Sequence, residues 1–153
     1  NDHKPGPSGE PRIWTIAHWT GNQWAFYQVT RSTHNYDMGS LYIESSGIWR
    51  IIAPTEPGPQ HWGTGGEMAI WISRDQGQHW EMGKQLTRGS HFNHTYARRP
   101  VNAHPDFYAF WADGNPDQFS ESRLYFTDQT GDQVWVLPYE MNQEREEPIP
   151  FQP

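Results

Sequence analysis

Two short segments combine a histidine and a tyrosine at alternate positions, and these side chains can exchange protons. His34 and Tyr36 form the first pair, and His94 and Tyr96 form the second. Because alternate residues of a β-strand point to one face, we expect each pair to share a face and Arg98 to join the second pair. A histidine can act as a base near neutral pH, and a tyrosine can protonate a leaving oxygen. All four residues are therefore predicted to be catalytic.

Such a face suits the elimination of a uronic acid. Removing the C5 proton requires that the neighbouring carboxylate be neutralised, and the planar guanidinium of Arg98 can bind both of its oxygens. Further candidates for substrate binding are Asn35, Asn93 and Glu67. Few acidic residues accompany them, which disfavours hydrolysis by a pair of carboxylates. The residues favour a lyase that acts on an acidic polysaccharide or oligosaccharide.

Asp37 is the main acidic residue of these segments, and it raises the question of a metal. It lies close in sequence to His34 and Asn35, and Ca²⁺ prefers carboxylate and carbonyl ligands. No complete calcium-loop pattern surrounds it. We expect no required cofactor, and bound Ca²⁺ at Asp37 is an alternative to a carboxylate held by backbone donors.

The composition describes a folded chain and excludes several classes of partner. The 153 residues carry a formal net charge of −7 and no cysteine, and 15% of them are aromatic. The aromatic residues supply enough apolar surface for a packed core. The acidity argues against nucleic acid as a partner, and no apolar run reaches the length of a membrane span. We therefore expect neither nucleic acid nor membrane to be a partner.

Internal repetition predicts the elements that position these residues. Three segments run from an aromatic-rich strand through a glycine turn to a tryptophan, and they span residues 12–24, 68–80 and 123–135. Their glycines, Gly21, Gly77 and Gly131, are 56 and 54 residues apart. A period of this length fits a four-stranded propeller blade. We predict an all-β fold of β-propeller blades, each with four antiparallel strands.

The predicted layout is about two and a half blades. Residues 1–11 form an N-terminal loop, 12–141 form the blades, and 142–153 form a Pro/Glu-rich tail. The hairpin at 12–30 is half a blade, and an ordinary β-sandwich is the alternative architecture. The strands of the two complete blades are Tyr36–Glu44, Gly47–Pro54, Glu67–Ser73 and Trp80–Thr87, then Tyr96–Asn102, Asp106–Ala112, Arg123–Thr127 and Gln133–Pro138.

Fewer than four blades cannot close a propeller. The predicted structure is therefore a wedge whose side faces are apolar. The missing blades are expected to come from a longer parent chain or from a partner chain.

The segment Ser73–Trp80 fits the pattern Ser-x-Asp-x-Gly-x-x-Trp at every fixed position. Asp75 can accept hydrogen bonds from its own turn, Gly77 can adopt a positive φ, and Trp80 can cover the blade. The pattern resembles the Asp box of BNR-repeat, sialidase-like β-propellers, in which the box lies away from the active mouth. Ser73, Asp75, Gly77 and Trp80 are thus expected to be structural.

More of the chain resembles a branch of BNR-repeat enzymes that act on rhamnose- and glucuronate-containing polysaccharides. The likeness is carried by residues 34–39, 62–67, 93–100, 110–114 and 122–126. The branch comprises ulvan lyases, rhamnose–glucuronate lyases and related α-L-rhamnosidases.

That resemblance implies a seven-bladed propeller and an extracellular or periplasmic protein whose signal peptide is not in this chain. It also implies a polysaccharide lyase acting by β-elimination at uronate, or a related α-L-rhamnoside hydrolase. A non-catalytic carbohydrate-binding or structural propeller fragment is the alternative.

Overall fold

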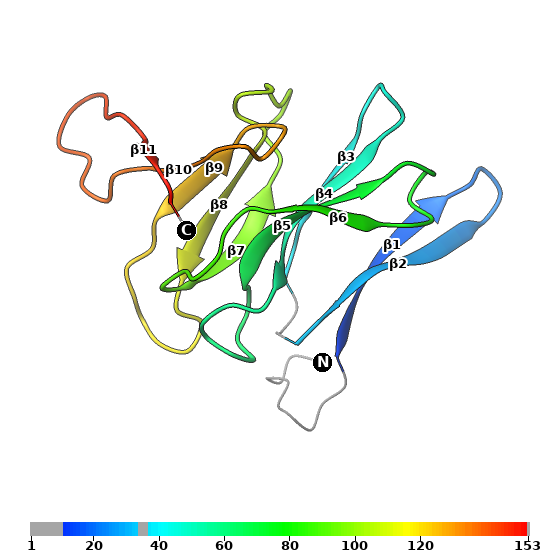
Figure 1. Ribbon diagram of the computed structural model, residues 1–153, viewed down its shortest axis with the longest axis horizontal. Helices are drawn as coiled ribbons and strands as arrows, with labels where there is room; N and C mark the ends of the chain where they lie inside the picture. The colour runs from blue at the N-terminus through cyan, green and yellow to red at the C-terminus, as the bar shows by residue number, and fades with distance from the viewer. Residues whose placement is uncertain (1–10, 34–36, 153) are drawn as a thin grey trace.

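The computed structural model describes residues 11–33 and 37–152, and its secondary structure is entirely β. The all-β prediction is confirmed. No helix in these ranges is long and apolar enough to cross a membrane. The strands form three antiparallel sheets of two, four and five strands, which stand side by side across the molecule (Figure 1).

Each sheet is a meander in which strands adjacent in sequence are paired. The two-stranded sheet is the hairpin of β1 (Arg12–Trp19) and β2 (Trp24–Ser32). The four-stranded sheet contains β3 (Ser40–Ile43), β4 (Trp49–Glu56), β5 (Glu67–Ser73) and β6 (Glu81–Gln85). The five-stranded sheet contains β7 (Asn93–Arg98), β8 (Ala109–Gly114), β9 (Leu124–Thr127), β10 (Val134–Val136) and β11 (Ile149–Pro150). The described residues form no closed propeller.

Most strand boundaries differ by a few residues from the sequence-based layout, among them the start of β3 at Ser40 and the start of β8 at Ala109. Two further differences change the five-stranded sheet. The strand expected over Tyr96–Asn102 is β7, which begins at Asn93 and ends at Arg98. It ends early because Pro100 has no N–H to donate to a ladder. The expected tail also returns to the sheet, where Ile149 and Pro150 pair with β10 and the Phe151 amide donates to the Val134 carbonyl.

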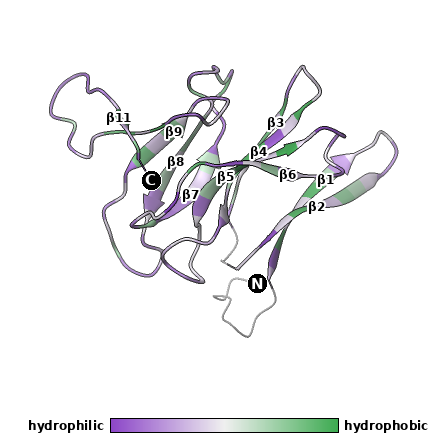
Figure 2. Ribbon diagram, viewed as in Figure 1, coloured by the Kyte–Doolittle hydropathy of each residue, from purple (hydrophilic) through white to green (hydrophobic). Residues whose placement is uncertain are grey.

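Apolar side chains from the sheets pack in two layers. Between the four- and five-stranded sheets lies the larger cluster, which includes Ile52, Met68, Ile70, Trp111 and Tyr125. Between the hairpin and the four-stranded sheet, Val29, Ile51 and Ala53 are buried, with Trp14, Ile16, Trp71 and Trp80 against them. Hydrophobic residues run along β1, β2 and β4 (Figure 2). The middle sheet is therefore covered on both faces.

The Asp-box segment forms the turn between β5 and β6. Asp75 Oδ1 accepts a hydrogen bond from the His79 amide (2.9 Å), and Ser73 Oγ accepts one from the Gly77 amide (2.9 Å). Trp80 closes the turn by donating from its indole nitrogen to the Gly77 carbonyl (2.8 Å). The His79 amide, together with the His79 ring, lowers the pKa of Asp75 to about 2. These side chains are engaged in holding the turn.

We expect that replacing Gly77 with alanine destabilises the protein by at least about 1–2 kcal/mol, because Gly77 has a φ of +86°. A Cβ at this position would also lie 2.9 Å from the Trp49 ring. Gly47→Ala is the matched control, since Gly47 has a φ of +85° and no atom within 4 Å of such a Cβ. Urea unfolding measures both variants. Equal losses would show that contact with Trp49 adds nothing.

Candidate functional site

Three connections gather at one end of the sheets, which we call the loop end. They are residues 57–66 between β4 and β5, 86–92 between β6 and β7, and 115–123 between β8 and β9. In Figure 1 they lie along the lower side of the molecule. The Asp-box turn lies at the opposite end of its sheet because successive turns of a meander alternate between ends.

His94, predicted to be a catalytic base, is fully buried beneath the loop end. Its Nδ1 lies 2.9 Å from Trp111 Nε1, and its Nε2 lies 2.9 Å from Ser90 Oγ. An indole nitrogen only donates, so Nδ1 must accept and the ring proton sits on Nε2. Burial lowers the pKa of His94 to about 3. The ring is therefore neutral at physiological pH, with both nitrogens occupied.

The hydrogen bonds are donated in one direction, from His94 through Ser90 to the buried carboxylate of Glu67. His94 Nε2 donates to Ser90 Oγ, which donates to Glu67 Oε2 (2.8 Å). Glu67 also accepts from the Ser90 amide (2.8 Å) and from Thr87 Oγ1 (2.5 Å). A catalytic histidine would need a free acceptor nitrogen facing the nucleophile, and here that nitrogen carries the proton. In this structure His94 and Glu67 are thus both engaged in holding Ser90 in place.

Asn93, predicted to bind substrate, also holds a loop. Its side-chain nitrogen Nδ2 donates to the carbonyls of Gln60 (2.9 Å) and Thr64 (3.1 Å), and its Oδ1 accepts from the backbone amide of Gln60 (3.0 Å). The Gln60 side chain returns a bond by accepting from the Asn93 amide (2.8 Å). Asn93 is fully buried, so it fixes the 57–66 connection to β7.

The expectation that His94, Tyr96 and Arg98 share one face is wrong. Thr95 pairs with Ala112 and Arg98 pairs with Phe110, so three steps on β7 oppose two on β8. The extra residue makes a β-bulge, with a φ of +52° at Tyr96. His94 consequently points inward, whereas Tyr96 and Arg98 are exposed, with the Arg98 guanidinium 5.5 Å from the centre of the Tyr96 ring.

Arg99, the next residue along the chain, packs its guanidinium on an aromatic ring. Its guanidinium carbon lies 5.0 Å from the centre of the Tyr42 ring. The charge is therefore held against an aromatic face.

Asp37 is hydrogen-bonded to β7 beside the exposed side chain of Tyr96. Its Oδ1 accepts from the Tyr96 amide (3.0 Å), which the bulge frees from the ladder, and from the Met38 amide (2.6 Å). Its Oδ2 is buried and has no hydrogen-bond partner in the described part of the chain. Burial raises the pKa of Asp37 to about 6, against the lowering effect of these amides and of Arg98. His34, Asn35 and Tyr36, which precede it, lie outside the described residues.

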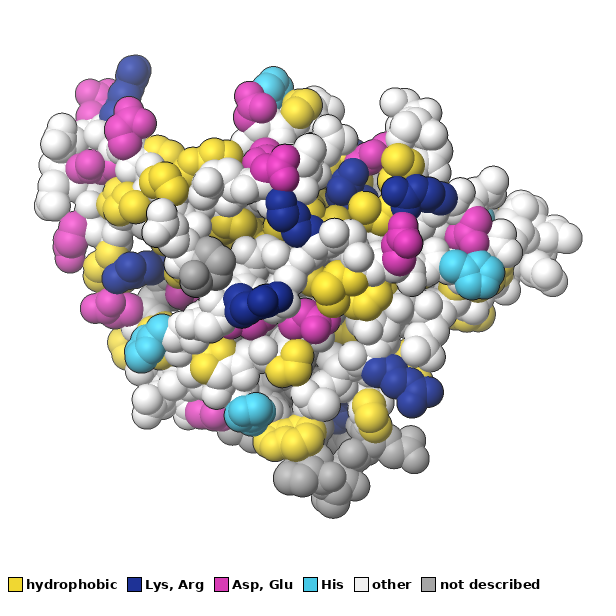
Figure 3. Space-filling view, viewed as in Figure 1, with side chains coloured by type: hydrophobic (Ala, Val, Ile, Leu, Met, Phe, Trp, Pro, Cys, Tyr) yellow, Lys and Arg dark blue, Asp and Glu magenta, His cyan; other side chains and the backbone are white. Residues whose placement is uncertain are grey.

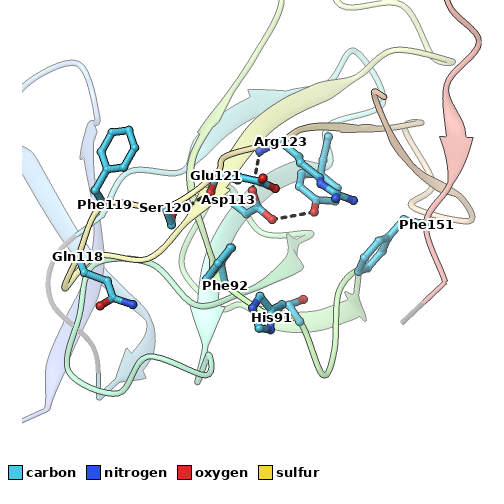
Figure 4. A pocket seen from close by; sticks show the side chains of 11 residues that line it. His91, Phe92, Asp113, Gln118, Phe119, Ser120, Glu121, Arg123 and Phe151 are labelled. Carbon is cyan, nitrogen blue, oxygen red and sulfur yellow. Dashed lines mark hydrogen bonds between the residues drawn. The ribbon is translucent and has the colours of Figure 1, made fainter. Parts of the chain in front are cut away.

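A pocket of about 570 Å³ opens at the loop end, beside the hydrogen bonds that join His94, Ser90 and Glu67. Ser90 contributes to both, so the buried hydrogen bonds fix part of the pocket wall. Figure 4 shows Asp113 near its centre, with Phe119 and Phe151 on opposite sides. The lining residues are Ser90, His91, Phe92, Asp113, Gln118, Phe119, Ser120, Glu121, Arg123, Tyr125 and Phe151.

Asp113 organises the polar part of this pocket. Its Oδ2 accepts from the Tyr125 hydroxyl (2.8 Å) and its Oδ1 from the Arg123 amide (2.7 Å). Burial, followed by the bond to Asp113, raises the pKa of Tyr125. Each carboxylate oxygen can accept a second hydrogen bond, so Asp113 retains acceptor capacity for a ligand. The side chains of Glu121 and Arg123 are exposed beside it.

The rim of the pocket carries an unsupported aromatic ring. Phe119 has a relative exposure of 103%. Phe151 lines the opposite wall with its ring 5.4 Å from that of Tyr125. The pocket thus combines apolar rings with carboxylates, an amide and a guanidinium.

The predicted set of site residues did not include these pocket residues. The sequence feature that indicates this pocket is the segment 113–121. It places Phe119 in a loop of polar and turn-forming residues, with Asp113 and Glu121 at its two ends. An apolar aromatic residue in a polar loop is a sign of a binding surface.

No metal centre is evident in residues 11–33 and 37–152, where no three His, Asp or Glu side chains gather. Comparison of the chain with models of protein families, with curated proteins and with solved structures finds no match.

Proposed function

We propose that this chain binds a carbohydrate through the loop-end pocket and that its ligand is an acidic polysaccharide or oligosaccharide. The observation that carries the proposal is the composition of the pocket, in which exposed Phe119 stands beside Asp113, Glu121 and Arg123. Sugars present C–H faces that stack on aromatic rings and hydroxyls that donate to carboxylates. This binding role is the non-catalytic, carbohydrate-binding alternative to the lyase.

The pocket residues divide the recognition of an acidic sugar among them. The guanidinium of Arg123 pairs with the uronate carboxylate in the bidentate geometry that arginine favours. Asp113 and Glu121 accept hydrogen bonds from the ring hydroxyls, and Phe119 stacks against the apolar face. Ser90, held by His94 and Glu67, keeps the wall in place.

The repeated sheets support a carbohydrate ligand because they agree with the resemblance to BNR-repeat propellers. We infer that the two meanders are successive blades of a β-propeller and that the β1–β2 hairpin is half of a third, in a BNR-repeat protein found outside the cytoplasm. The three Gly–Trp turns join β1 to β2, β5 to β6 and β9 to β10, and Gly21, Gly77 and Gly131 all have positive φ. The same position in each unit therefore carries the same turn.

Replacing Phe119 with alanine is expected to weaken binding of a rhamnose–glucuronate polysaccharide by about 5- to 30-fold, equivalent to about 1–2 kcal/mol for one stacking ring. Affinity electrophoresis in gels with and without the polysaccharide measures the change. Val101→Ala is the control, because Val101 is 94% exposed and does not line the pocket. Equal retardation of both variants and the parent chain would contradict the proposal.

A lyase is the second candidate, and Asp37 is the observation that favours it. Asp37 lies beside Tyr96 and Arg98 and has a pKa raised to about 6, which suits a general base. Arg98 would neutralise the uronate carboxylate and Tyr96 would protonate the leaving oxygen. In this account the base takes the C5 proton, the C4–O bond breaks, and an unsaturated uronate is released. His34 and Tyr36 remain candidates for catalysis, and Asn35 remains a candidate for substrate binding.

Ultraviolet absorbance of the unsaturated product tests this candidate. If the chain is a lyase, Arg98→Ala should lower kcat/KM at least about 100-fold, because one charge that stabilises the transition state is lost. Arg88→Ala is the control, since Arg88 is an exposed arginine that donates a hydrogen bond to Gln85 Oε1 (2.9 Å). Free rhamnose without absorbance would favour a hydrolase, and neither product would leave the binding function alone.

A further inference from the structure

The outward face of the β1–β2 hairpin is apolar and has a positive rim. Ile13, Trp19, Trp24 and Phe26 point away from the core, with relative exposures of 50–68%. Trp19 is paired with Trp24 across the hairpin. Residues 11–33 include Arg12 and Arg31 but no Asp or Glu. We call this surface the hairpin face.

The outward face of the five-stranded sheet carries a row of aromatic rings and a negative rim. Phe107 lies 5.1 Å from Phe126, and Phe126 stacks on Trp135 at 5.1 Å. A shallow pocket of about 640 Å³ lies over Phe126 and Trp135 and is bordered by Asp106, Asp128 and Asp132. Lys84 pairs with Asp132 (2.7 Å), so these three carboxylates outnumber one cation. Figure 3 shows apolar side chains gathered at upper left, where β9 and β10 lie in Figure 1. We call this surface the ring face.

We propose that the hairpin face of one copy packs on the ring face of a second copy of this chain. Both faces present aromatic rings on twisted antiparallel sheets, and their rims have opposite charges. The chain already contains one interface of this kind, where Trp14 and Ile16 of the hairpin and Trp71 of the middle sheet pack against one buried cluster. The proposed contact repeats that sheet-on-sheet packing between molecules.

The two faces lie on opposite outer sides of the three-sheet stack, because each sheet turns its other face toward the core. Their contact is therefore heterologous, so every bound copy leaves one hairpin face and one ring face open. Assembly continues from these faces until a ring closes. Since the rims attract each other, added salt weakens the association.

Analytical ultracentrifugation of the 153-residue chain over a range of concentrations tests the proposal. The parent chain should show species that grow with concentration. Trp24→Glu places an acid against the acidic ring face, and Phe107→Lys places a base against the basic hairpin face. Each variant alone should associate at least about tenfold more weakly. Ile43→Glu, at an exposed apolar residue of β3 outside both faces, should leave assembly unchanged.

Mixing the two variants tests the head-to-tail geometry. The Trp24→Glu chain keeps an intact ring face and the Phe107→Lys chain keeps an intact hairpin face, so the mixture should form a one-to-one heterodimer through these two faces. Phe26→Glu and Leu124→Lys repeat the experiment at exposed strand positions if either first variant unfolds. A parent chain that stays monomeric at every concentration would overturn the proposal. A mixture that stays monomeric while the parent assembles would also overturn it.

Discussion

His94→Ala should lose about 3–5 kcal/mol of unfolding free energy. The substitution opens a cavity next to Trp111 and Tyr125, and it removes the hydrogen-bond partners of the Trp111 indole and of Ser90. Urea unfolding measures the loss. His79→Ala, at an exposed histidine bonded to Asp75, should cost under about 1 kcal/mol.

A second variant separates the hydrogen bond from the cavity. Trp111→Phe keeps most of the ring volume but removes the indole N–H, so it should cost about 1–3 kcal/mol. If His94 were instead the catalytic base, His94→Ala would leave stability nearly unchanged and abolish turnover. That pattern would contradict the positioning role.

Loss of the His94 contribution should destabilise the protein at pH values where most of its carboxylates are still ionised. Burial lowers the pKa of His94 from 6.5 to about 3, so the unfolded chain binds a proton that the folded chain rejects. The stability that His94 contributes is thus complete above pH 6.5 and is lost as the pH falls. The loss from His94 alone between pH 6.5 and 4.5 should reach about 2–3 kcal/mol.

Asp37 acts in the opposite direction within part of this window. Its pKa is raised to about 6, so the folded chain takes up a proton before the unfolded chain does, and stability rises as the pH falls below 6. Asp37→Asn removes this offset and should steepen the loss. Urea unfolding at pH 7, 5.5 and 4.5 measures both proteins. A parent chain equally stable at these values, with no steeper loss in the variant, would show that His94 remains accessible to protons.

The sequence predicts the local elements of this fold well because turn chemistry is local. Gly21, Gly77 and Gly131 each mark a hairpin, and the Asp-box bonds form within eight residues of chain. The order of strands within each sheet follows from these turns. The closing strand β11 was harder to predict, since Ile149 and Pro150 lie among prolines and carboxylates that favour a tail.

Predicting the site required information that is not local. Regular alternation placed His94 and Tyr96 on one face, but the bulge at Tyr96 changes the phase of β7. No glycine marks that bulge, since a tyrosine adopts the positive φ. The burial of His94 depends on Trp111, Tyr125 and Phe151, which come from two other strands and from the chain end. The sequence therefore singles out His94 and Tyr96 as residues to examine, but it does not predict which side chains surround them.

The central claim is that the loop-end pocket binds an acidic carbohydrate, and amide chemical shifts test it most directly. A rhamnose–glucuronate oligosaccharide is titrated into the isotopically labelled chain, and the amide signals are followed. The account predicts saturable shifts at Phe92, Phe119, Glu121 and Arg123, with Tyr96 unchanged. Shifts confined to Asp37, Tyr96 and Arg98, or no shifts at all, would contradict it.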